Sequence, residues 1–157
     1  MQPNTGITTS HLDKIAHALC CALADEFVLY AKTRNAHWNV EGSDFYDKHK
    51  FFESQYEQLD ETMDMVAERI RTICHYAPAR LYELLRLTRL SEQPVENNDS
   101  LTFIKTLLED HESIIIHLRE NINLFTNELN DAGTSDFITS LMETHEKMAW
   151  MLRAHLR

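Results

Sequence analysis

Residues 10–37 read SHLDKIAHALCCALADEFVLYAKTRNAH, a stretch without glycine or proline that is long enough to set the fold class. Apolar side chains recur in it at spacings of three and four, the period of an α-helix with one buried face. They are Leu12, Ile15, Leu19, Leu23, Phe27 and Tyr30. Ser10 precedes Asp13 by three residues, so we expect Ser10 to cap the helix. The stretch therefore predicts one long amphipathic helix.

The rest of the chain is divided in the same way, because its 157 residues contain only three glycines and three prolines. We expect further long helices over residues 43–73, from Asp99 or Ser100 onward, and from Thr134 onward. Short turns at Gly42 and Gly133 make successive helices antiparallel neighbours. The connection over 74–99 is long, and Pro78 favours the start of a short helix over 79–87. One all-α domain over 1–157 is predicted: a four-helix bundle with a long central crossover.

The composition excludes several classes of protein. With 43% apolar and 25% charged residues the chain is neither disordered nor embedded in a membrane, and no apolar run approaches the length of a membrane span. So few glycines leave no room for a glycine-rich phosphate loop or for a sandwich of many short strands. Twenty-five acidic residues against fifteen basic ones give a net charge of −10. Such a surface repels phosphate backbones and attracts cations.

The N-terminus and the cysteines indicate a cytoplasmic protein. The first residues have neither the basic nor the apolar region of a signal peptide, and form a tail of about residues 1–9 without basic side chains. Cys20, Cys21 and Cys74 form neither a disulfide framework nor a Cys-x-x-Cys pair. We expect them to be buried, reduced thiols.

Four possible metal ligands share one side of the helix expected over 43–73: His49, Glu53, Asp64 and Glu68. On a helical wheel they fall within about 100° of one another, beside the apolar stripe. Glu53 and Asp64 are eleven residues apart, about 16 Å along a helix, so one metal ion cannot contact both. The pairs His49/Glu53 and Asp64/Glu68 are therefore two half-sites at opposite ends of one helix face.

A two-fold axis near Gln58 or Leu59 would place each half-site opposite its complement on a second copy of the chain. His37, before the turn, is positioned to add a second imidazole. Two histidines and three carboxylates suit iron, or less specifically zinc or manganese. The competing interpretation is a solvated acidic helix face supported by Lys50 and Arg71.

The remaining histidines have no partner set that the sequence reveals, and we expect them at the surface or the core edge. They are His11, His17, His75, His111, His117, His145 and His155. No histidine has a glutamate three residues before it, whereas metal sites inside single ferritin bundles use Glu-x-x-His. A metal site within one chain is therefore not expected.

Several of these motifs together resemble the signature of the Dps-type miniferritins (DNA-binding protein from starved cells), which belong to the ferritin-like superfamily. They are His37-Trp38, Gly42, Phe45, His49, Phe52, Glu53, Asp64 and Ala67-Glu68-Arg69. Residues 146–152, EKMAWML, are similar to that family's last helix. The resemblance spans nearly the whole chain. It implies an all-α, ferritin-like four-helix bundle in which a long crossover between the second and third long helices contains a short extra helix.

The resemblance also implies a function. Dps-type miniferritins are ferroxidases that assemble as hollow homododecamers, oxidise Fe(II) preferentially with hydrogen peroxide, store ferric mineral and so protect the cell from oxidative damage. Residue by residue, it implies that iron binds between two-fold-related chains. One chain would supply His37, His49 and Glu53, and its mate Asp64 and Glu68.

Three further residues receive roles from the resemblance. Trp38 matches a tryptophan that quenches stray oxidising equivalents, although it also reads as an ordinary aromatic residue at a helix end. Asp131 and Asp136 match the region that lines the three-fold iron-entry pores, although a loop and a helix start explain them almost as well.

The chain departs from the family pattern in two places. Many relatives have a Gly-Gly pair after the residues that match Glu68-Arg69, where this chain continues to ICHYAP over 73–78. Relatives that bind DNA directly often have a basic N-terminal tail, whereas Lys14 is the first basic residue here. Twelve copies would carry a formal charge of about −120, so direct DNA binding is not expected. The alternatives are a nucleoid protein that compacts DNA and a cage that binds zinc with little oxidation.

Overall fold

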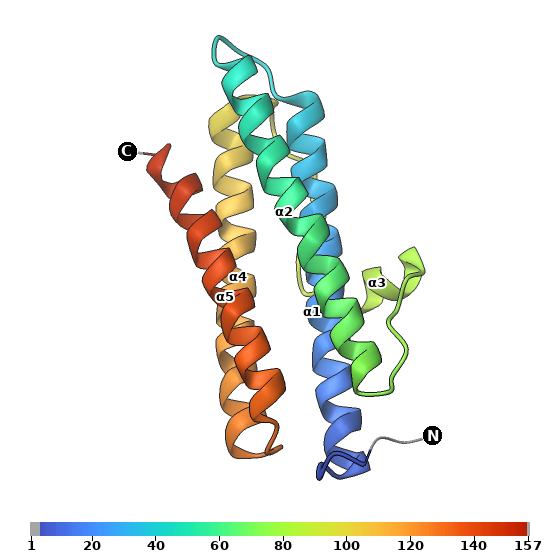
Figure 1. The fold of residues 1–157 in the computed structure, drawn as a ribbon. Coiled ribbons are helices and arrows are strands. Elements are labelled where there is room, and N and C mark those ends of the chain that lie inside the picture. Colours follow the sequence, from blue (N-terminus) through green and yellow to red (C-terminus); the bar gives the residue numbers. More distant parts are fainter. Residues whose placement is uncertain (1–3, 157) are drawn as a thin grey trace.

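The computed structural model describes residues 4–156, and five helices and no strands lie within that range. The helices are α1 (Thr9–Asn39), α2 (Phe45–Thr72), α3 (Leu81–Leu87), α4 (Ser100–Asn127) and α5 (Ala132–Ala154). The four long helices lie side by side, and the short α3 packs outside the bundle against α1 (Figure 1). The predicted four-helix bundle, with a short helix in its crossover, is confirmed.

The helix ends differ from the predicted ones because side chains outside the apolar stripes set them. Thr8, and not Ser10, caps α1 by accepting a hydrogen bond from the backbone N–H of His11. Asp131 caps α5 by accepting from the backbone N–H of Thr134 at 2.9 Å, so α5 begins two residues earlier than expected. Capping oxygens satisfy N–H groups that the helix leaves free.

The other boundaries shift by one or two residues. α2 begins at Phe45 and not at residue 43, because Asp44 is its N-cap residue. Gly42, in the turn before it, has a φ of +127°, which side chains rarely adopt. α2 ends at Thr72, one residue before the expected end. The short helix begins at Leu81 and not at residue 79, because Arg80 has an extended backbone. The expected tail also ends sooner, since α1 includes Thr9, and residues 1–3 lie outside the described part.

The core fills the space between the four long helices. Aromatic rings of α2 and α4 meet there, with the centroids of Phe52 and Phe103 6.2 Å apart. The largest fully buried side chains come from α1, α2 and α4 and from the short α3: Phe52, Phe103, Phe125, Ile15, Leu19, Leu29, Leu59, Ile70, Leu84, Ile104, Ile114 and Leu118. No helix in residues 4–156 is both long and apolar enough to cross a membrane.

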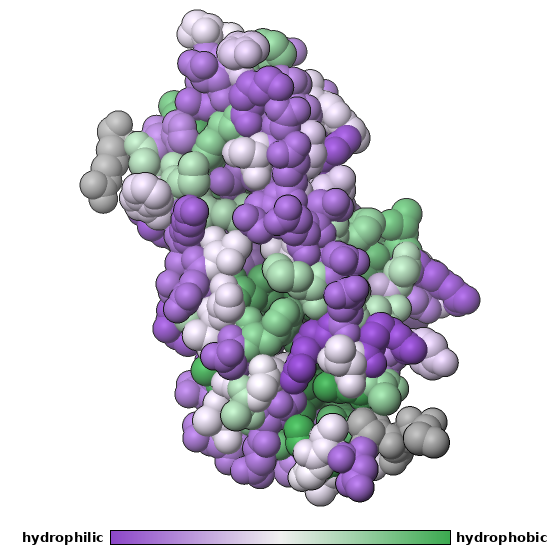
Figure 2. All heavy atoms as spheres, in the orientation of Figure 1, coloured by the Kyte–Doolittle hydropathy of each residue, from purple (hydrophilic) through white to green (hydrophobic). Residues whose placement is uncertain are grey.

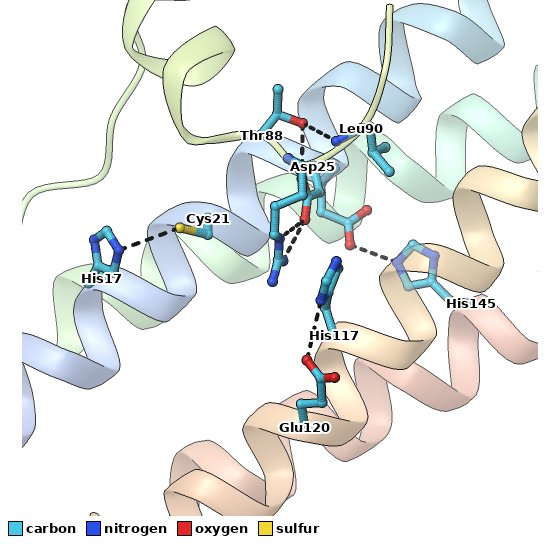
Figure 3. A network of polar contacts seen from close by, with 10 residues as sticks. His17, Cys21, Asp25, Thr88, Leu90, His117, Glu120 and His145 are labelled. Atoms are coloured by element: carbon cyan, nitrogen blue, oxygen red, sulfur yellow. Dashed lines mark hydrogen bonds and ion pairs between the residues drawn. The ribbon is translucent and has the colours of Figure 1, made fainter.

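A buried carboxylate fastens the crossover to α1. Asp25 is inaccessible to solvent and accepts hydrogen bonds from Thr88 Oγ1 at 2.9 Å and from the backbone N–H of Arg89 at 2.7 Å. The guanidinium of Arg89 adds an ion pair, with Nε 2.9 Å from Asp25 Oδ2 (Figure 3). Burial of a charge is tolerated when it is paired and hydrogen-bonded in this way. The long connection is thus held along the bundle.

The turn between α1 and α2 is tied to the start of α4. The backbone N–H of Glu41 donates to the carbonyl of Asn98 at 2.9 Å, and Ser100 Oγ donates to Asp44 Oδ2 at 2.7 Å. These contacts fix the end of α1 relative to the first turn of α2. That junction carries His37 and His49.

Candidate metal site

Two histidines on opposite sides of the α1–α2 turn hold each other by reciprocal hydrogen bonds. His37 Nδ1 donates to the backbone carbonyl of His49, and His49 Nδ1 donates to the carbonyl of His37, each at 2.8 Å. The rings stack with their centroids 3.8 Å apart. A carbonyl only accepts, so Nδ1 carries a proton in both rings, and in the neutral imidazole the lone pair is then on Nε2. This tautomer is the one in which Nε2 binds a metal.

Glu53 lies one turn after His49 on α2 and is held by Lys50. Lys50 Nζ is 2.6 Å from Glu53 Oε2, and both side chains are partly exposed. The hydrogen bond from this ammonium holds the pKa of Glu53 below its ordinary value, so the carboxylate is ionised at neutral pH. A cation that binds Glu53 therefore competes with Lys50.

Aromatic side chains surround the two imidazoles. The ring of Tyr56 meets that of His37 edge-on with centroids 5.1 Å apart, and Phe45 lies 5.2 Å from His49. His37 is buried and His49 half-buried. Little rotation is therefore open to either ring, so the Nε2 atoms are pre-positioned before a metal arrives.

Asp64 and Glu68 lie at the other end of the same helix face, as the spacing predicts. Both are exposed, and neither makes a side-chain hydrogen bond or ion pair within residues 4–156. Asp64 lines a hollow of about 510 Å³ beside the crossover. In the described part of the chain, no group of three or more His, Cys, Asp or Glu side chains is placed to hold a metal ion. One chain thus brings His37 and His49 together, with Glu53 one helical turn after His49, and leaves Asp64 and Glu68 at the far end of α2.

Trp38 lies next to His37 in sequence but projects to solvent, with 63% of its surface exposed. Its ring is covered on one side by the guanidinium of Arg34, whose central carbon lies 4.9 Å from the ring centroid and 4.3 Å from that of Tyr56. An arginine over an aromatic face is a favourable cation–π contact. Arg34 therefore connects Trp38 to an aromatic wall of the histidine pair.

The two aspartates assigned to an entry pore differ in their surroundings. Asp131 is buried and serves as the cap of α5, and its Oδ1 lies 3.6 Å from Arg69 NH2. Asp136 is exposed, with no side-chain partner in the described part of the chain. Asp131 thus has a structural role of its own, and a role at a pore stays a prediction for both.

Sequence reasoning missed a polar chain inside the bundle. His145 Nε2 donates to Glu26 Oε1 at 2.7 Å, and the Nδ1 atoms of His145 and His111 lie 2.9 Å apart. All three side chains are buried, so the expectation that His111 and His145 lie at the surface or core edge was wrong. Burial, and secondarily His145, lower the pKa of His111 well below its ordinary value. The available signal was helical spacing, since His145 follows the core residue Leu141 by four.

The cysteines are less buried than expected. Cys20 and Cys21 are half-buried, Cys74 is exposed, and all three are free thiols. Burial raises the pKa of Cys20 to about 11, with a smaller contribution from Cys21. The expectation that the three thiols are buried was therefore wrong.

Known proteins resemble the chain over most of its length. The family model for the ferritin-like domain matches residues 16–157. An uncharacterized low temperature-induced protein of Nostoc sp. is 37% identical over 98% of this chain and 86% of its own length. The DNA protection during starvation protein of Helicobacter pylori is 35% identical over 85% of this chain and 92% of its own.

Solved structures agree with these relatives. The Dps protein of Vibrio cholerae O1, described as a member of a broad superfamily of ferritin-like diiron-carboxylate proteins, superposes with a TM-score of 0.92. It is 29% identical, over 99% of this chain and 97% of its own. Antigen TpF1 of Treponema pallidum has a TM-score of 0.89 at 29% identity, over 100% and 99%. The chain therefore belongs to the ferritin-like family, as a Dps-type miniferritin.

Proposed function

We propose that the chain is an iron-sequestering ferroxidase whose catalytic sites form between two copies across a two-fold axis. Each site consists of His37, His49 and Glu53 from one copy and Asp64 and Glu68 from the other. Membership of the ferritin-like family supports iron as the substrate. Hydrogen peroxide is the expected oxidant, and ferric mineral stored inside a cage is the expected product.

The observation that carries this proposal is the reciprocal hydrogen bonding of His37 and His49. It leaves two neutral Nε2 lone pairs beside an ionised carboxylate, a donor set suited to a divalent transition metal. These three donors are too few to complete the coordination of the metal. The same face of α2 carries Asp64 and Glu68 at its far end, and neither has a side-chain partner within residues 4–156. In an isologous dimer the two copies of α2 cross antiparallel, because residue i of one copy meets residue j of the other and the reverse. The His49 end of one copy then lies opposite the Asp64 end of its mate.

The exposed apolar surface supports assembly into a homo-oligomer. Leu81, Tyr82 and Leu85 of α3 project to solvent, and so does the nearby Tyr76. Figure 2 shows apolar groups on the side where α3 lies, and further apolar groups lower on the same face among hydrophilic ones. Contiguous exposed apolar surface of this kind marks contacts with other chains. A dodecamer is the expected assembly, with Fe(II) and peroxide as its substrates.

The site chemistry follows from charge and electron count. Two Fe(II) ions lose one electron each, while hydrogen peroxide accepts both as its O–O bond breaks, so no hydroxyl radical is released. The imidazoles bind without adding charge, and the three carboxylates offset three of the four positive charges of two Fe(II) ions. Trp38, next to a ligand and in contact with Arg34, is placed to give an electron to a stray oxidant.

The test is complementation between two defective chains, His49→Ala and Asp64→Ala. Each variant alone is expected to oxidise Fe(II) no faster than buffer after a peroxide pulse, followed by stopped-flow absorbance of ferric species. When both are co-expressed with different tags, a mixed pair regains one complete site. Random pairing then restores about a quarter of the wild-type sites. Wild type should consume about two Fe(II) per peroxide.

The outcomes separate the alternatives. Restored activity in the mixed cage establishes the intersubunit site. Activity that the single variants retain, or that mixing fails to restore, contradicts the proposed ligand set. Elemental analysis of protein prepared without chelator tests the zinc alternative. Bound zinc in place of iron, together with slow oxidation of Fe(II), would favour a zinc-binding cage.

A further inference from the structure

A histidine and a cysteine one turn apart on α1 form a second cluster of metal-binding side chains. His17 Nε2 lies 3.9 Å from Cys21 Sγ (Figure 3). The pair borders a hollow of about 580 Å³ between α1 and α4, lined also by Asp13, Arg89 and Asn121. None of these residues belongs to the proposed iron site. The cluster therefore has no part in the function proposed above.

The distance between the two donor atoms matches a shared metal ion. Zinc binds cysteine sulfur at about 2.3 Å and histidine nitrogen at about 2.0–2.1 Å, so tetrahedral ligands lie about 3.6 Å apart. The observed 3.9 Å exceeds this by only a few tenths of an ångström. Both residues sit inside an uninterrupted helix of 31 residues, whose backbone keeps the spacing fixed. Little reorganisation is needed to bind.

The protonation of the pair also fits. The thiol of Cys21 can donate to Nε2 of His17 only when that nitrogen has a lone pair, which is the form that binds a metal. Burial raises the pKa of Cys21 above its ordinary value, Arg89 opposes this and Asp25 adds to it. The thiol therefore keeps its proton at neutral pH, and a metal that binds sulfur must release that proton to solvent.

The charges around the hollow permit a cation. Arg89 lines it, but its guanidinium is paired with Asp25, with Nε 2.9 Å from Oδ2. Lys14 is the other basic side chain in the lining, and Asp13 stands one turn before His17. Asp13 Oδ1 accepts from His75 Nε2 at 3.0 Å. The charge of Arg89 is thus offset by Asp25, and Lys14 is the other cationic side chain that lines the hollow.

We propose that His17 and Cys21 form a separate site for a thiophilic cation of the Zn²⁺ or Cu⁺ class. The ion replaces the thiol proton, binds Cys21 Sγ and His17 Nε2, and completes its coordination with water in the hollow. No oxidation state changes. Thiolate sulfur selects such ions over Fe(II), which separates this site chemically from the five ligands of the iron site.

The test uses Cd²⁺ as the probe, because cadmium bound to thiolate absorbs in the ultraviolet and the iron site contains no sulfur. Reduced, iron-free protein should show one thiolate–cadmium band per chain, which Zn²⁺ then removes by competition. Cys21→Ser should abolish the band, and His17→Ala should weaken Cd²⁺ binding at least about tenfold. A chromophoric Cu⁺ chelator measures in a parallel titration whether the pair prefers Cu⁺ to Zn²⁺.

Cys20→Ser is the matched control, since it removes the neighbouring half-buried thiol and should keep the band. The double variant His49→Ala/Asp64→Ala should keep it too, so failure here is distinguishable from failure of the proposed iron site. Wild type without a band, or a band that survives Cys21→Ser or disappears in Cys20→Ser, overturns the assignment. Circular dichroism verifies that each variant is folded.

Discussion

The buried chain Glu26–His145–His111 couples the stability of the bundle to pH. Burial lowers the pKa of His111 well below its ordinary value, so near pH 6 the unfolded chain binds a proton there that the folded chain does not. The free energy of unfolding therefore falls as pH drops below about 6.5, by up to about 1.4 kcal/mol per pH unit from this residue. This loss continues until the lower, folded-state pKa is reached.

Replacing the residue tests this linkage. We expect His111→Leu to flatten the decline in urea-unfolding midpoint between pH 7.5 and pH 5, even if the variant is less stable at pH 7.5. His117→Leu serves as control, because His117 is only half-buried and contacts the exposed Glu120. An unchanged slope in His111→Leu would show that His111 does not carry the dependence.

For individual residues, sequence spacing predicted the shared helix face of the proposed ligands, whereas it did not predict the buried polar groups. His49, Glu53, Asp64 and Glu68 could be placed on one face because helix geometry alone decides their angles. The Nδ1 contacts of His37 and His49 could not be predicted, since they depend on how the turn folds back. Tertiary packing likewise decides that His111 and His145 face inward.

Among the elements, the crossover depends on one buried ion pair. Asp25→Ala removes the acceptor of four hydrogen bonds, one from Thr88 and three from Arg89, and leaves the guanidinium unpaired. Breaking a buried pair costs about 3–5 kcal/mol, so we expect a loss near the lower figure because Arg89 is partly exposed. Urea unfolding measures it, and limited proteolysis should show cleavage between α3 and α4.

The surface pair of Arg153 and Glu112 provides the matched control. Their atoms are 2.6 Å apart, but nearly half of each side chain is exposed. Exposed pairs contribute about 0–1 kcal/mol, so Glu112→Ala should leave both measurements nearly unchanged. Equal losses in Glu112→Ala and Asp25→Ala would refute the anchoring role of Asp25.

The existence of the helices was predictable, and their ends were less so. Glycine and proline are so rare that the few present mark most boundaries between the long helices. The spacing of apolar residues by three and four independently indicates that these stretches are α-helical. Ends depend on single capping oxygens such as those of Thr8 and Asp131, which compete with equally suitable neighbours. Ser10 and Thr134 are such neighbours, which is why the expected starts were displaced by one or two residues.

For the whole molecule, net charge determines whether it binds or repels nucleic acid. The chain carries −10, and its first ten residues contain no lysine or arginine. Several related proteins are named for DNA protection, yet this chain is acidic, and Lys14 is the first basic residue of the given sequence. Binding that depends on phosphate contacts strengthens steeply as salt is lowered, so low salt is the most permissive condition.

We therefore expect no shift of duplex DNA by the assembled wild-type protein at low salt, in a gel or by fluorescence anisotropy. A variant with a short lysine-rich extension before Met1 is the positive control, because each added charge releases counterions and should restore salt-sensitive binding. A wild-type shift that weakens with added salt would contradict the expectation and favour compaction of DNA. With no shift, any protection of DNA by this protein comes through removal of Fe(II) and peroxide, since the acidic surface that repels phosphate also concentrates cations.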